Sequence, residues 1–152
     1  GLTREHVDVE RVVEEVRRAL APQAAQKRIS IVSEGALTLW AVEKDLWEIL
    51  HNLMGNAIRY GRRGGHVKIL LRQRCIIVED DGIGIEKKHL PYLFEQFYRV
   101  DQSRDPEVRG TGLGLSIVRT LAERNGATVG VESCPGRGSR FTVCFEQKQD
   151  GD

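Results

Sequence analysis

Apolar residues recur at every third or fourth position in three stretches of the chain, a spacing that predicts three amphipathic helices. The first covers residues 10–27, and Pro22 within it is expected to kink or end that helix. The second covers residues 45–60, has the broadest apolar stripe, and stops at a glycine-rich stretch. The third covers residues 115–125, with Gly126 directly after it as a C-terminal stop.

Shorter segments with alternating or continuous apolar residues predict strands between and after these helices. Their residues are 7–9, 28–33, 36–42, 66–71, 75–80, 127–132 and 139–146. Turns are predicted at Glu34 and Gly35, in a tight hairpin from Arg72 to Arg74, and at SCPGRG before the last strand. Because helices and strands mix without a regular strand-helix-strand alternation, the pattern predicts an α+β fold. We expect a two-layer α/β sandwich, with a mixed, mostly antiparallel sheet covered on one face by about three helices.

The composition is that of one ordinary folded domain, and we expect residues 1–152 to form one. Lys and Arg number 23 against 22 Asp and Glu, so the net charge of +1 gives no general attraction to nucleic acid or to an acidic membrane. No apolar run approaches the roughly 18 residues of a membrane span, and the first residues are too polar for a signal peptide. The sequence predicts a soluble, cytoplasmic chain, which could also be the cytoplasmic part of a membrane-anchored protein.

The cysteines are Cys75, Cys134 and Cys144, an odd set without the C-x-x-C spacing of a zinc or redox site. This usage favours reduced thiols, as in cytosolic proteins, over a disulfide framework. We therefore expect all three cysteines to have structural roles.

Three glycines at alternate positions lead into the third predicted helix, in the segment RGTGLGLSIV at residues 109–118. A dinucleotide-binding fingerprint needs G-x-G-x-x-G directly after a strand, and a phosphate-binding P-loop needs G-x-x-x-x-G-K-[ST]. The segment has neither spacing. Two interpretations stay open: a flexible loop that brings an anion to the free N–H groups of a helix N-terminus, or a plain turn before a helix.

A polar stripe runs beside the apolar stripe of the second predicted helix. The spacing places Asn52, Asn56, Arg59 and Tyr60 on one helix face. An amide oxygen is a hard, neutral ligand, which suits a Mg²⁺ ion whose other ligands are mainly phosphates. A guanidinium binds phosphate oxygens, and a tyrosine ring can stack on a base. The stripe suits a nucleotide phosphate site, and the alternative is a solvated helix edge.

The segment DDGIGI follows the predicted strand 75–80 and combines acids with two glycines. Asp80 could accept a hydrogen bond from an adenine amino group, and Gly82 and Gly84 leave room for the ring. Such a bond to a charged group is worth about 1.5–3 kcal/mol, and guanine, which has an acceptor in place of the amino group, would leave the carboxylate unpaired. The alternative is an ordinary Asp-Gly turn.

Together with two further segments, these motifs resemble the ATP-binding catalytic domain of sensor histidine kinases, a member of the Bergerat-fold group that also contains DNA gyrase B. In this chain HNLMGNAIRY resembles the family's N box, VEDDGIGI resembles its G1 box, and LFEQFYRV resembles its F box. RGTGLGLSIV resembles its G2 box, and GRGSRFTV resembles its closing glycine-strand motif. All five occur in the family's order, and the resemblance covers residues 7–145. It implies the Bergerat fold and the binding of ATP with Mg²⁺.

Carried over position by position, the resemblance also implies roles for individual residues. It makes Asn56 the Mg²⁺ ligand and Asp80 the adenine anchor. It makes Asn52, Arg59 and Arg99 the candidates for catalytic roles near the triphosphate. The implied nucleotide-binding set further contains Tyr60, Gly82, Gly84, Ile85, Tyr98, Gly110, Thr111, Gly112, Leu113, Gly114, Leu115 and Thr142, with Thr142 expected near the adenine pocket.

The resemblance implies a mobile lid over the nucleotide at residues 100–109, followed by the glycines of the G2 box as its hinge. The sequence departs from the family pattern at Asp81, where asparagine is more usual, and at Arg109, where a further glycine is common. The hairpin from Arg72 to Arg74 is also shorter than usual. None of these departures removes a group that the chemistry requires.

Position 52 separates two chemistries within the fold group, because the ATPases generally have a glutamate there to activate water. The amide of Asn52 cannot take that proton, which suits a kinase that keeps its γ-phosphoryl group for another acceptor. The family's phosphorylatable histidine is followed by an acidic residue, and this is true of none of the four histidines, His6, His51, His66 and His89. We therefore expect a separate dimerisation and phosphoacceptor domain before residue 1, a monomeric fragment and a homodimeric full protein.

The expected reaction transfers the ATP γ-phosphoryl group to a histidine on that domain, and from there to an aspartate of a response regulator. No nucleic acid and no direct membrane contact is expected. Two alternatives stay open: an ATP hydrolase or conformational clamp of the same fold, and a non-enzymatic ATP-binding docking module. The three differ in whether phosphate is transferred, released or only bound with its nucleotide.

Overall fold

The computed structural model describes residues 3–100 and 114–146. Its elements are β1 (Glu5–Asp8), α1 (Val9–Lys27), β2 (Ser30–Gly35), β3 (Thr38–Ala41), α2 (Glu43–Arg59), β4 (His66–Arg72), β5 (Cys75–Asp80), the 3-10 helix η1 (Lys87–Tyr92), α4 (Gly114–Arg124), β6 (Ala127–Cys134) and β7 (Gly138–Phe145). The helices and strands therefore follow the predicted segments closely, within a few residues at their ends.

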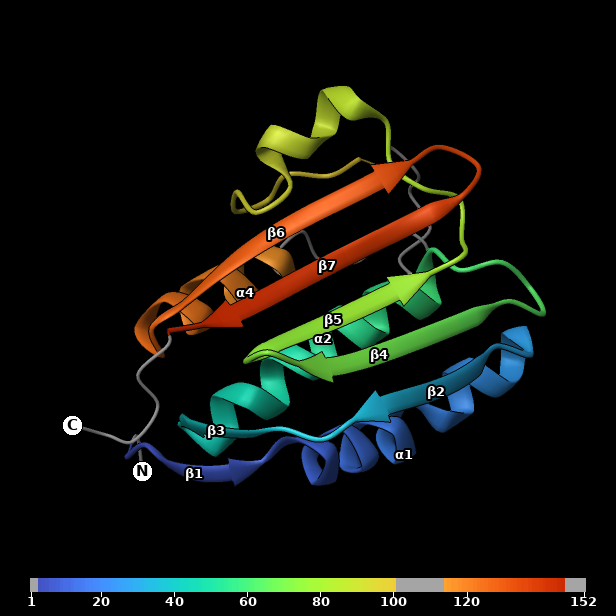
Figure 1. Cartoon of the computed structure of the whole chain (residues 1–152). Coiled ribbons are helices and arrows are strands. Elements are labelled where there is room, and N and C mark those ends of the chain that lie inside the picture. The colour runs from blue at the N-terminus through green and yellow to red at the C-terminus, as the bar shows by residue number, and fades with distance from the viewer. Residues whose placement is uncertain (1–2, 101–113, 147–152) are drawn as a thin grey trace.

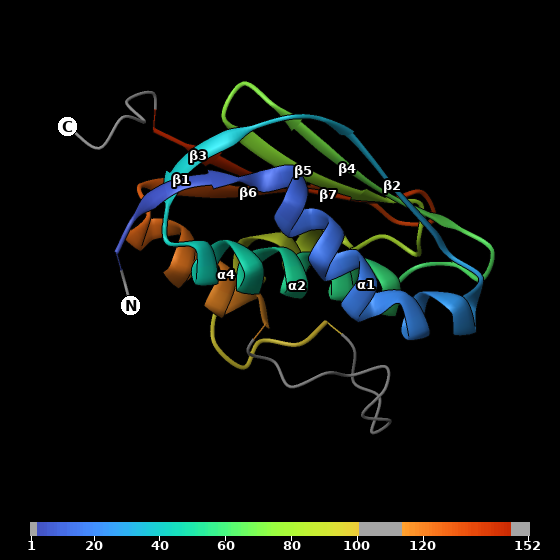
Figure 2. The same cartoon turned by 90° about the horizontal axis from the view of Figure 1, so that it is seen from below.

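A five-stranded sheet in the order β2-β4-β5-β7-β6 forms one layer of the molecule (Figure 1). Figure 2 shows α1, α2 and α4 together on one side of this sheet. The pair β2-β4 is parallel, whereas β4-β5, β5-β7 and β6-β7 are antiparallel. The predicted α+β sandwich, with its mixed, mostly antiparallel sheet and three covering helices, is confirmed. Among the described residues, no helix combines the length and apolar character needed to cross a membrane.

The core lies between the sheet and the helices, with α2 at its centre. The buried side chains of α2 include Leu46, Ile49, Leu50, Leu53, Met54, Ala57 and Ile58. They pack with Val118, Leu121 and Ala122 of α4 and with the inward positions of the sheet strands in one cluster. Fully burying each large apolar side chain contributes about 1.5–3 kcal/mol, so α2 is a firmly held base for its polar stripe.

Of the two effects predicted for Pro22, a kink or an end of the helix, the second is wrong, because α1 continues to Lys27, the last residue of the predicted segment. Pro22 has no N–H to donate to the carbonyl of Arg18, one turn earlier. That residue is exposed, so water can bond to its carbonyl group. Leu20 and Ala24, on either side of the proline, are both buried and hold the two halves of the helix to the core.

The turn predicted at Glu34 and Gly35 is also misplaced, because β2 includes both residues and Gly35 pairs with Leu71 of β4. Gly35 has a φ of 91°, and a Cβ atom there would lie 2.1 Å from the Leu71 carbonyl oxygen. The glycine thus serves a close strand contact instead of a turn. The chain then crosses into a second, two-stranded sheet, in which β3 pairs with β1.

The tight hairpin between β4 and β5 is confirmed. Gln73 and Arg74 connect the strands, with φ angles of 52° and 62°. Two successive residues in the left-handed region are typical of the two-residue turns whose twist matches that of paired strands.

The prediction of reduced thiols is wrong for two of the three cysteines, because Cys75 of β5 and Cys144 of β7 form a disulfide with an S–S distance of 2.08 Å. The two residues lie opposite each other on adjacent antiparallel strands. The N–H of Phe145 donates to the carbonyl of Arg74 at 2.9 Å, so these two residues form a hydrogen-bonded pair. Because hydrogen-bonded and non-hydrogen-bonded pairs alternate, Cys75 and Cys144 form a non-hydrogen-bonded pair, in which side chains approach closest. Cys134 is a free, exposed thiol.

Candidate functional site

The C-terminal end of α2 and the DDGIGI segment after β5 lie against each other. The N–H of Ile83 donates to the carbonyl of Tyr60 at 3.2 Å. A Cβ atom at Gly82 would lie 2.2 Å from the same carbonyl oxygen, so this approach requires glycine. The structure thus brings together predicted nucleotide-binding residues that are more than twenty positions apart in the sequence.

Asp80 ends β5 and lies on the helix-covered face of the sheet. Ile76 and Val78 of the same strand are buried in the core, and alternation along a strand puts Asp80 on their side. Burial raises the pKa of the Asp80 carboxyl, while hydrogen bonds from the backbone N–H groups of Gly82 and Ser139 offset this only in part. The bond from Gly82 is 2.9 Å long. A poorly solvated carboxylate gains from a further donor, which suits the predicted role of adenine anchor.

Asn52 lies on the side of α2 that faces the first residue of α4. Its Nδ2 donates to the carbonyl of Glu48 at 2.7 Å, and its Oδ1 would lie 3.0 Å from a Cβ atom placed on Gly114. An amide oxygen next to a helix N-terminus is a combination that suits a phosphate group with its Mg²⁺. Asn56 follows one turn later on the same face, half-buried. The residues present therefore fit the predicted phosphate end of the site.

A lysine that the sequence analysis did not single out holds the C-terminal end of α2. Lys27, the last residue of α1, donates its Nζ to the carbonyls of Ile58 at 2.9 Å and Arg59 at 2.5 Å. Burial, with a smaller contribution from the charge of Arg59, lowers the pKa of this ammonium group. A cation at a helix C-terminus stabilises the helix, and here it fixes the end that carries Arg59 and Tyr60. The pattern gave no signal, because a terminal lysine is normally solvated.

Arg62 connects three loops around the Asp80 end of the sheet. Its Nε donates to the carbonyl of Asp81 at 3.0 Å, and its Nη2 donates to the carbonyl of Gly136 at 2.6 Å. The loop after α2, the DDGIGI segment and the turn between β6 and β7 are thereby held together. Both partners are backbone groups, so no sequence signal could have shown this role.

Asp81 forms hydrogen bonds to the first residue of β4. At this position the family with similar motifs has asparagine more often. The Asp81 carboxylate accepts the backbone N–H of His66 at 2.8 Å, and its second oxygen lies 2.9 Å from Nδ1 of the same histidine. Burial opposes ionisation, but the contacts with His66 outweigh it and lower the pKa of Asp81. The departure from the family pattern thus supports the strand beside Asp80, and the charge of Asp81 contributes to the raised pKa of Asp80.

Thr142 is not near Asp80, so the prediction that it lies by the adenine pocket is wrong. Thr142 pairs with Ile77 in β5, and its neighbours on both sides along β7 belong to the core, so its side chain lies on the opposite face of the sheet. Ser139, which was not predicted, is the residue opposite Asp80. It is buried, and its Oγ lies 2.7 Å from the Oγ of Ser133.

The remaining predicted residues fall into four groups. Gly84 packs against the end of β6, where an added Cβ atom would lie 2.1 Å from the carbonyl oxygen of Cys134. Tyr98 contacts η1, with its hydroxyl 2.6 Å from Nδ1 of His89, and Arg99 follows it, half-buried. Ile85 and Leu115 pack partly buried against the core. The hinge residues Gly110, Thr111, Gly112 and Leu113, and the predicted lid apart from its first residue, lie outside the described residues.

Two glycines of the β6-β7 turn give a matched test of the packing around Asp80. Gly138 has a φ of 124°, and a Cβ atom there would lie 1.9 Å from the carbonyl oxygen of Asp80. Gly136 also has a positive φ, 80°, but nothing lies within 4 Å of its added Cβ. We expect Gly136→Ala to lower the free energy of unfolding by about 1 kcal/mol, for backbone strain alone. Gly138→Ala should lower it by about 2 kcal/mol more, because a backbone atom must also move.

Urea unfolding of both variants measures this difference. Equal losses in the two variants would show that the turn tolerates a side chain beside Asp80 and would contradict the close contact.

Comparisons with known proteins identify the family of the chain. Residues 41–149 match the family described as "Histidine kinase-, DNA gyrase B-, and HSP90-like ATPase", and the chain belongs to that family. Within it, the chain is a catalytic ATP-binding domain of the sensor histidine kinase kind. This membership supports ATP binding as its general role.

Two curated relatives illustrate the match. The phosphate regulon sensor protein PhoR of Pseudomonas aeruginosa is 40% identical over 126 residues, which are 80% of this chain and 28% of the relative. The sensor-like histidine kinase SenX3 of Mycolicibacterium smegmatis is 38% identical over 151 residues, which are 95% of this chain and 39% of the relative. The chain thus spans well under half the length of either protein.

Solved structures share the fold. The mycobacterial sensor histidine kinase MprB aligns with a TM-score of 0.80 at 22% identity, over 93% of this chain and 95% of that chain. The structure of full-length ShkA in complex with AMPPNP aligns with a TM-score of 0.78 at 30% identity, over 94% of this chain and 31% of that chain.

Proposed function

We propose that the chain binds Mg·ATP and transfers the γ-phosphoryl group to a histidine on a separate dimerisation and phosphoacceptor domain. The observation that carries this proposal is that α2 has a candidate adenine anchor beside its C-terminal end and an amide that faces the start of α4. Asp80, a carboxylate with a raised pKa, lies beside the C-terminal end of α2, because Gly82 donates to it and packs against the carbonyl of Tyr60. Asn52, one of the amides on that helix, faces the start of α4.

The two ends have different tasks. Asp80 holds adenine through its amino group and disfavours guanine, which would leave a half-buried carboxylate without a donor. Asn52, Asn56 and Arg59 hold the triphosphate, together with the backbone N–H groups at the start of α4. Mg²⁺, held by Asn56 and the phosphates, supplies charge neutralisation when bound.

In the transfer itself, the bond between the γ-phosphorus and the bridging oxygen of ADP breaks as a bond to the histidine nitrogen forms. The attacking nitrogen uses its lone pair, so the proton that is lost comes from the other ring nitrogen of that histidine and goes to a base on the phosphoacceptor domain. This chain contributes position and charge, which are the main sources of catalysis in phosphoryl transfer. Asn52 cannot accept a proton from water, so hydrolysis is not promoted and the phosphoryl group stays available to histidine.

The full protein is proposed to be a homodimer that passes the phosphoryl group on to an aspartate of a response regulator. The fragment, which lacks a histidine followed by an acid, is proposed to be a monomer that does not label itself. Incubation of the chain alone with γ-labelled Mg·ATP tests this point. Stable label on the chain would overturn the proposal, and steady phosphate release that Asn52→Ala abolishes would favour the hydrolase alternative.

The binding of adenosine is expected to weaken as the pH falls from neutral, with a midpoint above the ordinary aspartate pKa of 3.8. The ionised Asp80 accepts the Gly82 N–H with one oxygen and can accept the amino hydrogen with the other, whereas protonation removes the charge and turns one oxygen into a donor. Burial makes this carboxyl take up its proton at a higher pH than an exposed one does. Affinity is therefore full above the raised pKa of Asp80 and is lost below it. Calorimetric titrations with adenosine, which lacks the titrating phosphates of ATP, measure the midpoint.

The variant Asp81→Asn sharpens this pH experiment. The charge of Asp81 contributes to the raised pKa of Asp80, so the midpoint should move to slightly lower pH in the variant. An adenosine affinity that stays constant over the whole range in both proteins would contradict the role of Asp80.

A further inference from the structure

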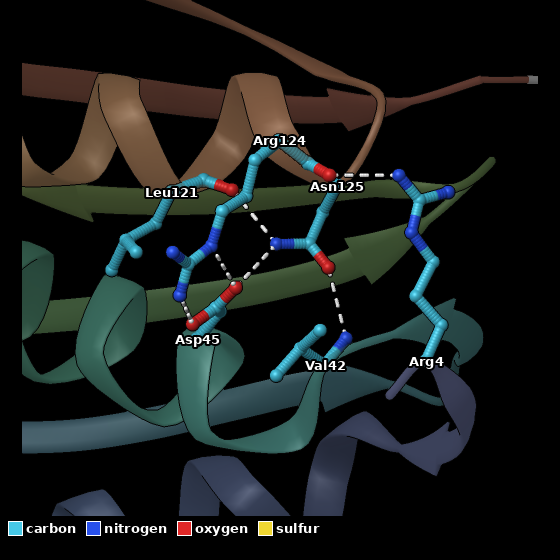
Figure 3. Close-up of polar contacts among 6 residues, drawn as sticks. All are labelled: Arg4, Val42, Asp45, Leu121, Arg124 and Asn125. Atoms are coloured by element: carbon cyan, nitrogen blue, oxygen red, sulfur yellow. Dashed lines mark hydrogen bonds and ion pairs between the residues drawn. The ribbon is translucent and has the colours of Figure 1, made fainter. Parts of the chain in front are cut away.

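A cluster of polar side chains joins the ends of α2 and α4 that lie away from Asn52 and Gly114. Asp45, in the first turn of α2, is only 1% exposed. It receives two hydrogen bonds from Arg124, from Nε at 2.8 Å and from Nη2 at 2.6 Å, and a third from Nδ2 of Asn125 at 2.8 Å (Figure 3). The bonds from Arg124 outweigh burial and lower the pKa of the Asp45 carboxyl.

The other polar atoms of the cluster bind backbone groups of three segments. Oδ1 of Asn125 accepts the N–H of Val42, directly before α2, at 2.8 Å. Nδ2 of Asn125 also donates to the carbonyl of Leu121 at 2.8 Å, and the carbonyl of Arg124 accepts Nη2 of Arg4 at 2.7 Å. Figure 3 shows these contacts converging on the last turn of α4. The start of α2, the end of α4 and the residues before β1 are thus held at one point.

Apolar packing alone would not fix α4 along α2. The buried residues of α4 are Val118, Leu121 and Ala122, and such contacts resist separation but are not directional. A bidentate arginine–carboxylate pair has a fixed geometry, so it specifies one axial position of the helix. The 11 residues of α4 form a rod of about 16 Å, which transmits that position to Gly114 and to the space beside Asn52.

We infer that Asp45, Arg124 and Asn125 are positioning residues for the phosphate end of the nucleotide site. The inference rests on the proposed function, because it assumes that phosphates bind between Asn52 and the start of α4. The cluster lies about a helix length from that space, so it acts through the placement of α4 and not by touching the ligand. None of the cluster's hydrogen bonds among the described residues reaches Asp80, which ends a strand of the sheet.

The affinities for two ligands separate positioning from simple stabilisation. Adenosine uses only the Asp80 end of the site, whereas Mg·AMP-PNP, an ATP analogue that is not hydrolysed, uses both ends. In the double variant Asp45→Leu with Arg124→Met, a buried ion pair is replaced by apolar side chains, a change that folded proteins often tolerate. We expect the affinity for Mg·AMP-PNP to fall about tenfold while that for adenosine stays within about twofold.

Two further variants complete the experiment. Arg124→Lys keeps the charge but loses the bidentate geometry, so it should show a smaller loss in the same direction even if the double variant does not fold. Glu43→Gln is the matched control, because it removes an exposed ion pair with Arg11 at the same end of α2 and should leave both affinities unchanged.

The outcomes distinguish the inference from the proposed function. If the unmodified chain binds adenosine and Mg·AMP-PNP but folded variants of Asp45 and Arg124 keep the same ratio of affinities, the inference is overturned and the proposed function stands. If the unmodified chain binds neither ligand, the proposed function fails, and the inference fails with it.

Discussion

Replacing Asp80 by asparagine is expected to weaken the binding of Mg·ATP by about 10- to 100-fold, the worth of a hydrogen bond to a charged acceptor. The N–H of Gly82 already donates to Oδ1 of this side chain. An asparagine would keep its single oxygen toward that donor and turn its NH₂ group toward the amino group of adenine. Two donors would then face each other, so the loss exceeds that of a simple deletion.

The same substitution is expected to stabilise the ligand-free domain at neutral pH. Burial raises the pKa of Asp80, so the folded state binds its proton more tightly than the unfolded state does. Stability therefore decreases as the pH rises from the ordinary value through the raised one, and the full penalty is present at neutral pH. The amide that replaces this carboxylate carries no charge to desolvate, hence Asp80→Asn should raise the thermal midpoint. Calorimetry and thermal unfolding measure the two opposite effects.

Asp81→Asn is the control for both measurements. Contacts with His66 lower the pKa of Asp81 despite its partial burial, so its charge contributes stability that is present at neutral pH and lost as the pH falls. This variant should lose a little stability and keep its affinity for Mg·ATP within about twofold, since the pair is largely exposed. An Asp80→Asn protein that binds Mg·ATP as well as Asp81→Asn does would contradict the adenine-anchor role.

Opening the disulfide between Cys75 and Cys144 is expected to lower the free energy of unfolding by about 4 kcal/mol, the chain-entropy value for a loop of this length. The two cysteines are 69 positions apart, so the bridge restricts a large part of the unfolded chain. Both are half-buried at the end of the β5-β7 pair opposite Asp80 and Ser139, where a reductant can reach them. Urea unfolding with and without a thiol reductant measures the loss.

Thiol counting and one variant complete this test. The native protein should present one reactive thiol, Cys134, and three after reduction. Cys134→Ser should unfold like the unmodified chain, and the double variant Cys75→Ala with Cys144→Ala should match the reduced protein. Three reactive thiols in the oxidised native protein, or an unfolding midpoint that the reductant does not move, would show that the bridge is absent.

Local patterns predicted most of the fold. The helix α2 follows from an apolar stripe in which each residue is within four positions of the next. The same stripe defines the polar face that carries Asn52 and Asn56. The hairpin between β4 and β5 follows from its short connection. These features depend on neighbours in the sequence, so the sequence alone contains the information. The proximity of Asp80 to that polar face needed the order of the family motifs as well.

The sequence-based predictions are wrong where a contact joins segments that are distant in the sequence. They are also wrong where a shift of one position moves a side chain to the other face of the sheet. Cys75 and Cys144 meet only because β5 and β7 pair in one register, which their spacing does not reveal. Thr142 and Ser139 are three positions apart on β7, an odd number, so choosing the wrong one reverses the side of the sheet. The contact of Asp45 with Arg124 joins two helix ends 79 positions apart, and each residue alone is an ordinary helix-terminal charge.

The central claim, phosphoryl transfer to a histidine in trans, is tested most directly by adding γ-labelled Mg·ATP to this chain together with the phosphoacceptor domain of its full-length protein. The account predicts label on the acceptor domain that is stable in base and lost in acid, as expected for phosphohistidine. The label should be absent when the acceptor histidine is replaced and strongly reduced when Asp80→Asn replaces the unmodified chain. An acceptor domain that stays unlabelled while this chain binds Mg·ATP would contradict the account and favour a nucleotide-binding docking module.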